Sequence, residues 1–150
     1  MPDIFYHGIL SSLIFWNHDR KKATLYGMLP DLISFGPYVI YQLFTGINFN
    51  IHDVPKWVHK NYNLGHSIFF WICLYFLIYL LSGYNEYLLL APIISIILDI
   101  PFHSMNAYPT PFLWPLSDYK VDGITWTEPY ISNLLYLFLL SFYYYRRNYN

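Results

Sequence analysis

The sequence predicts an all-α protein: a polytopic membrane helical bundle of about four to five helices. Three observations predict this class. Hydrophobic residues make up 56% of the chain and charged residues 11%, whereas soluble domains have about 45–50% and about 25%. Aromatic residues alone account for 23%, so a disordered chain or a coiled coil is excluded. Several stretches contain no Asp, Glu, Lys or Arg, namely 4–18, 32–52, 61–85, 87–98 and 129–145.

The length of 150 residues fits one domain. We therefore expect residues 1–150 to form a single membrane-embedded helical domain. Within it we expect a short or re-entrant hairpin at the N-terminus and a proline-rich lid loop in the second half.

The first apolar stretch, residues 4–16, is too short to cross a bilayer alone, because a full helical span needs about 20 residues. A polar turn and a second short apolar segment follow it, up to Pro30-Asp31. We interpret this region as a helical hairpin, re-entrant or short, that ends where Pro30 breaks the helix. The alternative is a true span over 4–18 followed by a second over 23–45.

Three later stretches are the expected membrane spans. Residues 67–81 are apolar on every face, whereas a soluble helix would carry a polar stripe. Residues 130–145 end in three tyrosines that precede two arginines, an aromatic belt followed by a basic stop. Residues 88–102 are the third expected span, and 39–44 lie in a weaker fourth.

Two segments are expected to be loops. Residues 46–64 are polar and contain Pro55. Residues 103–129 are rich in proline and too long for a simple connection. We expect this second loop to be a lid or a lipid-interface segment, with residues 109–117 covering a site.

Five ionisable residues lie within or beside the apolar segments: His7, Asp31, His66, Asp99 and His103. Such residues are costly in hydrocarbon, so their default interpretation is functional. If the helices alternate in direction, the three histidines and Asp99 share one side of the membrane. Only a re-entrant hairpin brings Asp31 to that side.

Asp99 and His103 are four residues apart, which on a helix places both on one face. Pro101 lies between them and predicts a kink. The alternative is that Asp99 serves as a cap or ion-pair partner at the helix end and His103 is a loop residue. The remaining histidines, His18, His52 and His59, are expected to be solvated.

Carboxylate and imidazole together suit a divalent metal: zinc, or else manganese or iron. We expect His7, Asp31, His66, Asp99 and His103 to supply the ligands for one or two such ions. A bound metal lowers the pKa of its water toward about 7 and polarises a substrate oxygen. Asp31 or Asp99 is the candidate catalytic general base.

Other function classes lack their signatures. The net charge is −1, so electrostatics predict no nucleic-acid partner. No nucleophile elbow, Walker loop or dinucleotide-binding glycine pattern occurs. A single cysteine, Cys73, permits no disulfide within the chain.

Several motifs recur in one known family. They are His7 before an apolar helix, Gly-Met-Leu-Pro-Asp-Leu at 27–32, Leu-Gly-His-Ser at 64–67, Leu-Asp-Ile-Pro-Phe-His-Ser at 98–104, Pro-Thr-Pro-Phe-Leu-Trp-Pro-Leu-Ser at 109–117 and Gly-Ile-Thr-Trp at 123–126. The chain thereby resembles the bacterial inner-membrane metal-dependent hydrolase family, which is itself distantly similar to zinc-dependent phospholipase C. The block at 109–117 is the most specific of these motifs.

The chain departs from this family in two places. Family members often have a second acid two residues after the one at Asp31, where this chain has Ile33. Many also have a histidine four residues before the acid at Asp99, and here that position is Ser95. His103, four residues after the acid, is our candidate for the replacement ligand.

The resemblance implies an integral protein of the bacterial inner (plasma) membrane. It also implies hydrolysis of an ester or phosphoester in a membrane lipid or other amphiphilic substrate. One alternative is a catalytically degenerate relative that serves as a membrane structural or assembly protein. Another is an ion or proton path that uses the same acids and histidines. The sequence does not indicate the oligomeric state.

Overall fold

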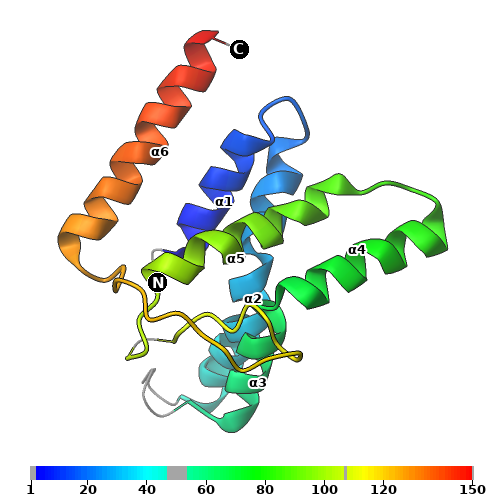
Figure 1. The fold of residues 1–150 in the computed structure, drawn as a ribbon, viewed down its shortest axis with the longest axis vertical. Coiled ribbons are helices and arrows are strands. Elements are labelled where there is room, and N and C mark those ends of the chain that lie inside the picture. Colours follow the sequence, from blue (N-terminus) through cyan, green and yellow to red (C-terminus); the bar gives the residue numbers. More distant parts are fainter. Residues whose placement is uncertain (1–2, 47–53, 107, 150) are drawn as a thin grey trace.

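The computed structural model describes residues 3–46, 54–106 and 108–149, and in these the fold is all-α, as predicted (Figure 1). No strand occurs in the described ranges. Six α-helices and one short 3-10 helix follow each other along these ranges: α1 (Asp3–Ile14), α2 (Arg20–Thr45), α3 (Lys56–Gly65), α4 (Ile68–Ser82), η1 (Tyr87–Leu89), α5 (Leu90–Phe102) and α6 (Pro129–Tyr149).

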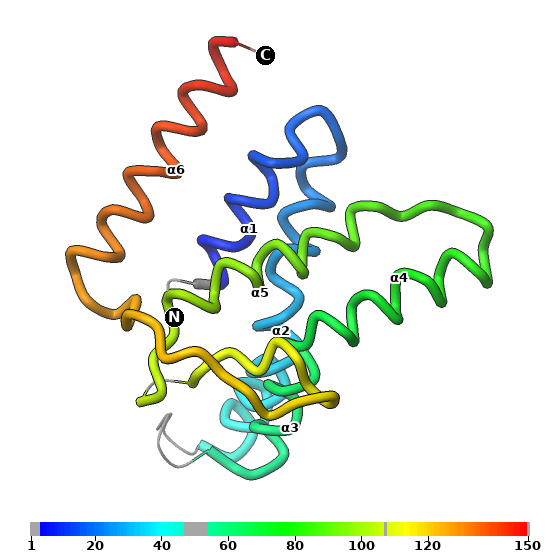
Figure 2. The backbone as a smooth tube through the Cα atoms, viewed as in Figure 1, coloured from blue at the N-terminus to red at the C-terminus, as the bar shows by residue number. Residues whose placement is uncertain are grey.

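Helices α1 and α2 form an antiparallel hairpin at the centre of the molecule, which Figure 2 shows as the blue to cyan part of the tube. The side chain of Asp19 caps α2 by accepting a hydrogen bond from the backbone N–H of Lys22. The two helices approach closely at Gly8 and Gly27. A Cβ on Gly27 would lie only 2.6 Å from the carbonyl oxygen of His7. This close packing places His7 against the middle of α2.

The expectation that Pro30 ends the hairpin is wrong. α2 continues through Pro30 and Pro37 and ends at Thr45, where Gly46 caps it in a left-handed conformation. A proline inside a helix costs about 3 kcal/mol, but α2 packs against α1, α3 and α5 along a buried face. Burial of that face outweighs the local cost. Asp31 therefore lies in the interior of a long buried helix rather than at a broken end.

The expected loop at 46–64 is also wrong in its second half, because α3 begins at Lys56. The buried side chains Val58 and Tyr62 lie on one face of α3 and pack against Phe35 and Tyr38 of α2. This i, i+4 spacing is an amphipathic helical pattern, although the polar residues around it resemble a loop. His52 lies outside the described residues.

α4, η1 and α5 form a second hairpin that projects from the body (Figure 1). Near the body, Trp71 of α4 packs against Leu89 and Ile96. The turn between α4 and η1 is connected to α2 by an ion pair between Glu86 of the turn and Lys22 of α2. The Glu86 carboxylate also raises the pKa of Lys22 through its hydrogen bond.

The proline-rich segment between α5 and α6 runs back across the junction of α3 and α4, as the yellow part of the tube in Figure 2 shows. The backbone N–H of Ile68 donates to Phe112 O at 3.1 Å, and the Ser67 hydroxyl donates to Trp114 O. The segment also returns to the end of α5, where Ile124 N donates to Pro101 O at 2.9 Å. The loop therefore covers the junction and satisfies carbonyls at the end of α5.

No single helix in the described ranges combines the length and apolar composition needed to cross a membrane. α3 and α4 meet these criteria only as a pair, bent by 62° at the break between them. Of the expected spans, 67–81 corresponds to α4 with 15 residues and 88–102 to α5 with 13.

Candidate functional site

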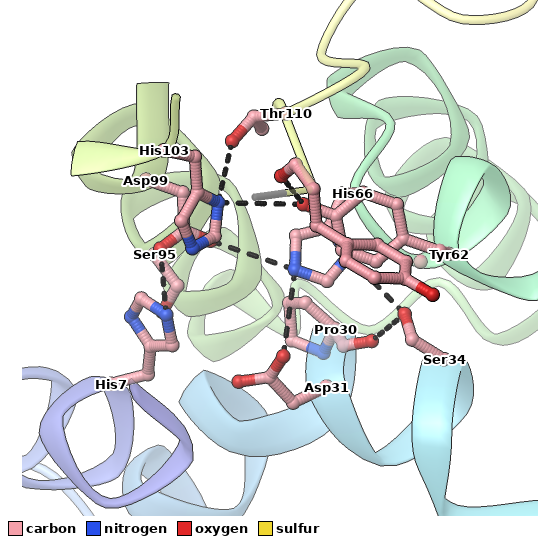
Figure 3. A network of polar contacts seen from close by, with 12 residues as sticks. His7, Pro30, Asp31, Ser34, Tyr62, His66, Ser95, Asp99, His103 and Thr110 are labelled. Carbon is pink, nitrogen blue, oxygen red and sulfur yellow. Dashed lines mark hydrogen bonds and ion pairs between the residues drawn. The ribbon is translucent and has the colours of Figure 1, made fainter. Parts of the chain in front are cut away.

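All five candidate residues are buried and converge on one region (Figure 3). They come from four parts of the fold. His7 lies on α1, Asp31 on α2, and His66 at the α3–α4 junction, while Asp99 and His103 lie on α5 and directly after it. The continuous α2 brings Asp31 into the group, so no re-entrant segment is needed to place it there.

Asp99 lies between two histidines. Its Oδ1 is 2.9 Å from Nε2 of His7, and its Oδ2 is 3.6 Å from Nε2 of His66. The same His66 nitrogen is 3.6 Å from Oδ1 of Asp31. His66 Nε2 thus faces two carboxylates from different helices.

His103 is connected to this group through Tyr62. The Tyr62 hydroxyl lies 3.4 Å from His103 Nδ1, and the Tyr62 ring stacks on His66 with ring centroids 4.1 Å apart. Thr110, from the proline-rich loop, lies 3.1 Å from the same His103 nitrogen. The loop therefore contacts the site directly at residue 110.

The expected helical relationship between Asp99 and His103 is not found. α5 ends at Phe102, and His103 has extended backbone angles of φ −114° and ψ 124°. The loop pairs with the carbonyls of Pro101, Phe102 and His103, and these bonds replace a further helical turn. His103 therefore points toward Tyr62 and Thr110 instead of following Asp99 along one helix face.

Close backbone packing positions His66. A Cβ on Gly65 would lie 2.6 Å from Pro30 O and 2.7 Å from Ser34 Oγ, so only glycine lets α3 approach α2 this closely. The indole N–H of Trp71 donates to Gly65 O at 2.8 Å and fixes the start of α4 over the same turn. His66 is thereby held against α2 at Asp31.

Ser34 determines which nitrogen of His66 carries the proton. Its hydroxyl donates to Pro30 O at 2.6 Å and lies 3.2 Å from His66 Nδ1. Because its proton is committed to the carbonyl, the hydroxyl accepts at this second contact, and the imidazole donates from Nδ1. The Nε2 atom of neutral His66 then presents a lone pair toward Asp31 and Asp99.

Burial lowers the pKa of His66 to about 3. The nearby Asp99 carboxylate acts in the opposite direction, while positive charge on His103 or His7 lowers the pKa further. Desolvation is the largest of these effects, because the imidazole is fully buried. At neutral pH His66 is therefore uncharged, which is the state in which imidazole binds a metal.

His66 Nε2 and Asp99 Oδ2 are atoms of the types that divalent cations accept as ligands. His66 Nε2 and Asp99 Oδ2 are buried and have no hydrogen-bond partner in the described part of the chain. A lone pair facing carboxylates across 3.6 Å is unfavourable unless a proton, a water or a cation lies between them. Ligand atoms about 2.0–2.1 Å from a tetrahedral ion lie roughly 3.3–3.4 Å from each other. The separations around His66 are close to that spacing.

The arrangement at His7 is different. Its Nε2 contacts Asp99 Oδ1 directly at 2.9 Å, so these two atoms pair with each other. Among the residues that the structure describes, no group of three or more His, Cys, Asp or Glu side chains is positioned to hold a metal ion. A shared ion would require the His7 and Asp99 side chains to separate.

The other histidines in the described ranges lie outside the site. His18 and His59 are exposed, as expected from their polar surroundings. His18 pairs with the Tyr87 hydroxyl at 2.8 Å, and His59 stacks on Tyr108. Ser95 lies on α5 near Asp99, where its hydroxyl donates to Gly27 O at 3.1 Å and joins α5 to α2.

Three residues of the site were not predicted from the sequence: Ser34, Tyr62 and Thr110. Two of them share a helix face with a predicted residue. Ser34 is three residues after Asp31 on α2, and Tyr62 of α3 is four residues before His66, the residue that follows this helix. This spacing is a usable signal once each segment is known to be helical. Thr110 has no such local signal, because it reaches the site from the loop.

The chain matches no protein-family model, no curated protein and no solved structure.

Proposed function

We propose that this chain is a membrane-bound metal-dependent hydrolase that acts on an ester or phosphoester of a lipid-like substrate. One observation carries the proposal: Nε2 of buried His66 faces both Asp31 and Asp99 at 3.6 Å. The motifs that resemble the inner-membrane hydrolase family support it, because they contain these three residues.

Zinc suits this donor set best, since it accepts both imidazole and carboxylate ligands. His66 and Asp99 would hold the ion, with His7 or His103 completing its coordination. When bound, the ion supplies Lewis-acid polarisation of the substrate oxygen and a more acidic water. A catalytic ion also needs an open position, so not all five residues serve as ligands.

The two acids have different roles in this proposal. The two oxygens of Asp99 face Nε2 of His7 at 2.9 Å and Nε2 of His66 at 3.6 Å, so in this proposal Asp99 serves as the ligand between the histidines. Asp31 acts as general base and accepts a proton from the attacking water. The water oxygen bonds to the carbonyl carbon or phosphorus of the substrate, and the ester bond breaks. The departing alkoxide takes up the proton held by Asp31, so the base is regenerated.

The surface of α4 supports a location in the membrane. The helix is apolar on all sides, and its exposed side chains include Phe76, Leu77, Leu80 and Leu81. Such a surface is unfavourable in water and suited to a bilayer. We therefore propose that α4 and the apolar part of α6 contact lipid, as in a polytopic protein of the bacterial inner membrane.

Metal content is the direct test. The purified protein, in detergent and without chelator, is analysed for bound metals beside the variants Asp99→Asn and Asp118→Asn. Asp118 is exposed on the proline-rich loop and is the matched control. We expect the parent and Asp118→Asn to retain zinc, manganese or iron, and Asp99→Asn to lose it. A parent protein that binds no metal under any condition would overturn the proposal.

Hydrolysis is measured on vesicles that contain fluorogenic ester or phosphoester lipids, with and without chelator. We expect chelator-sensitive turnover that Asp31→Ala abolishes. If Asp31→Ala and Asp99→Ala fold, assemble and behave like the parent, the chain is instead a structural or assembly protein.

A further inference from the structure

A polar pocket of about 270 Å³ lies between α3 and the proline-rich loop. Its wall is formed by His59, Tyr62 and Asn63 of α3 and by Asn106, Tyr108 and Lys120 of the loop. The volume corresponds to roughly nine water molecules at about 30 Å³ each. It suits a small polar group, since pockets for drug-sized ligands occupy about 300–1,000 Å³.

The charge of this pocket favours an anion. Lys120 lines it, and no carboxylate from the described ranges does. Asp118 and Asp122 are close to Lys120 in sequence but do not line the pocket, and Asp122 instead accepts a hydrogen bond from the backbone N–H of Met105 at 2.8 Å. Lys120 forms no ion pair with a described residue. The pocket therefore contains a positive charge that its own wall does not neutralise.

Another polar pocket of about 270 Å³ shows the contrast. It is lined by Lys22 together with Asp19 and Glu86. Its lysine forms an ion pair with Glu86. An ammonium group without a neighbouring carboxylate is therefore a property of the pocket at α3 and is not common to the polar pockets of this chain.

The other polar side chains of the pocket are hydrogen-bond donors. The amides of Asn63 and Asn106 each provide an NH₂ group, and the imidazole of His59 provides an N–H. The structure contains no hydrogen bond between these three side chains and another described residue. An ammonium group and several N–H donors around one space form a set that recognises phosphate oxygens.

Two further lysines increase the positive potential beside the pocket. Lys56 and Lys60 are exposed on α3. They share a helix face with His59 and Asn63, because the four positions fall within roughly 100° of the helix circumference. Neither lysine forms an ion pair with a described residue. A concave site surrounded by charges of one sign attracts ligands of the opposite sign.

The wall of the pocket at Tyr108 has an unfavourable backbone conformation. Its φ is 52°, which bulky L residues rarely adopt. Two other residues of the pocket hold Tyr108 in place. The Tyr62 hydroxyl donates to Tyr108 O at 2.7 Å, and His59 stacks on the Tyr108 ring with centroids 5.4 Å apart. Backbone strain that the surrounding structure maintains is concentrated at functional sites, which agrees with a ligand in this pocket.

We propose that this pocket binds a phosphate group, carried by the headgroup of an anionic phospholipid or by a free phosphate ester. Lys120 supplies the charge, and the two amides and the imidazole donate hydrogen bonds to the phosphate oxygens. The pocket neighbours the candidate metal site, since Tyr62 lines it and stacks on His66 with centroids 4.1 Å apart. The inference goes beyond the proposed function and requires neither a metal nor a passage between the two sites.

Isothermal titration calorimetry tests the phosphate site. The protein, in detergent with chelator, is titrated with dihexanoyl phosphatidic acid, a short-chain lipid with a terminal phosphate. Dihexanoyl glycerol, which lacks the phosphate, is the matched ligand. We expect the phosphatidic acid to bind saturably at one per chain and dihexanoyl glycerol not to bind. The affinity should fall as the salt concentration rises, because salt screens the attraction between the lysines and the phosphate.

Matched lysine variants identify the charge responsible. Lys120→Gln removes the charge in the pocket, Lys120→Arg keeps it, and Lys21→Gln removes the charge of an exposed lysine at the start of α2. We expect Lys120→Gln to weaken binding about tenfold or more, as for loss of a charge-assisted hydrogen bond, and the other two variants to bind within about threefold of the parent. Circular dichroism establishes that Lys120→Gln is folded.

Inorganic phosphate distinguishes the two sources of the ligand. If it binds and depends on Lys120, the pocket accepts a free phosphate group, whereas binding of the lipid alone with that dependence identifies a phospholipid headgroup. Either result supports the proposal. No binding of either probe, equal affinity of Lys120→Gln and the parent, or equal binding of dihexanoyl glycerol would overturn it. Because chelator is present, and Asp99→Asn should bind phosphate as the parent does, failure of this site is distinguishable from failure of the proposed metal site.

Discussion

Gly27 of α2 faces Ser11 of α1 so closely that a Cβ on the glycine would lie 2.2 Å from the serine Oγ. Backbone is equally close, since that Cβ would lie 2.6 Å from His7 O. The contact lets α1 lie directly on α2, and this packing brings His7 to Asp99.

Gly27→Ala is therefore expected to destabilise the fold by about 2 kcal/mol or more, because a backbone carbonyl cannot move aside as a flexible side chain can. Gly36→Ala is the control, since nothing lies within 4 Å of its Cβ position on the same helix. The control should gain about 0.5–1 kcal/mol from helix propensity. Thermal unfolding in detergent measures both changes. Equal midpoints for the two variants would contradict the close approach.

Ser34→Ala tests the hydroxyl that fixes the His66 tautomer. Without it, Nδ1 of His66 loses its acceptor, and the proton is no longer directed away from Nε2. We expect metal affinity to fall about 10–100-fold, as is typical when the partner of a ligand histidine is removed. Competition with a chromogenic zinc chelator provides the measurement.

Ser141→Ala is the matched control for this change. Its hydroxyl also donates to a carbonyl four residues earlier, Leu137 O at 2.9 Å, but lies on the exposed surface of α6. Affinity should be unchanged in this variant. If Ser34→Ala binds metal as tightly as Ser141→Ala does, the tautomer is set by something other than Ser34.

The five clustered residues could be found from the sequence because the pattern that marks them is local. An ionisable side chain in an apolar segment is costly wherever it lies, so His7, Asp31, His66, Asp99 and His103 stood out without knowledge of the fold. The structure buries all five in one region. Whether they bind metal is a separate question, which the chelator and metal-content measurements address.

The predicted helix end at Pro30 and the predicted loop over the residues of α3 are wrong because tertiary packing outweighs the local conformational preference of the sequence. Pro30 argues for a helix end, yet α2 continues because its buried face packs on three other helices. The polar residues of α3 argue for a loop, yet Val58 and Tyr62 anchor a helix against α2. Thr110 could not be predicted from local sequence either, because its contact with His103 depends on the path of a long loop.

Trp71 anchors the junction that carries His66. Its fully buried indole N–H donates to Gly65 O, so Trp71→Phe leaves that carbonyl without its partner and a gap in the packing. We expect a loss of about 2–4 kcal/mol in stability from the combined effects. Trp57→Phe, at an exposed position on α3, should cost less than about 1 kcal/mol. Chemical denaturation followed by circular dichroism distinguishes the two, and similar losses would show that the junction does not depend on the indole.

The single cysteine reports where α4 lies. Cys73 is exposed on this helix, next to the exposed side chains of Ile72 and Phe76. If α4 contacts lipid, a membrane-impermeant maleimide cannot reach the thiol in sealed or opened vesicles, because the reagent does not enter hydrocarbon. We expect labelling at least about tenfold slower than for a cysteine in the polar turn between α1 and α2.

The comparison uses Asn17→Cys in a Cys73→Ser background, since Asn17 is exposed in that turn. Denaturation in SDS should make Cys73 fully reactive, which shows that the thiol is intact. Opened vesicles are required in addition to sealed ones, because they give the reagent access from both sides. If Cys73 then reacts as fast as the cysteine at position 17, α4 faces water, and the apolar surface of this helix must be covered by something other than lipid.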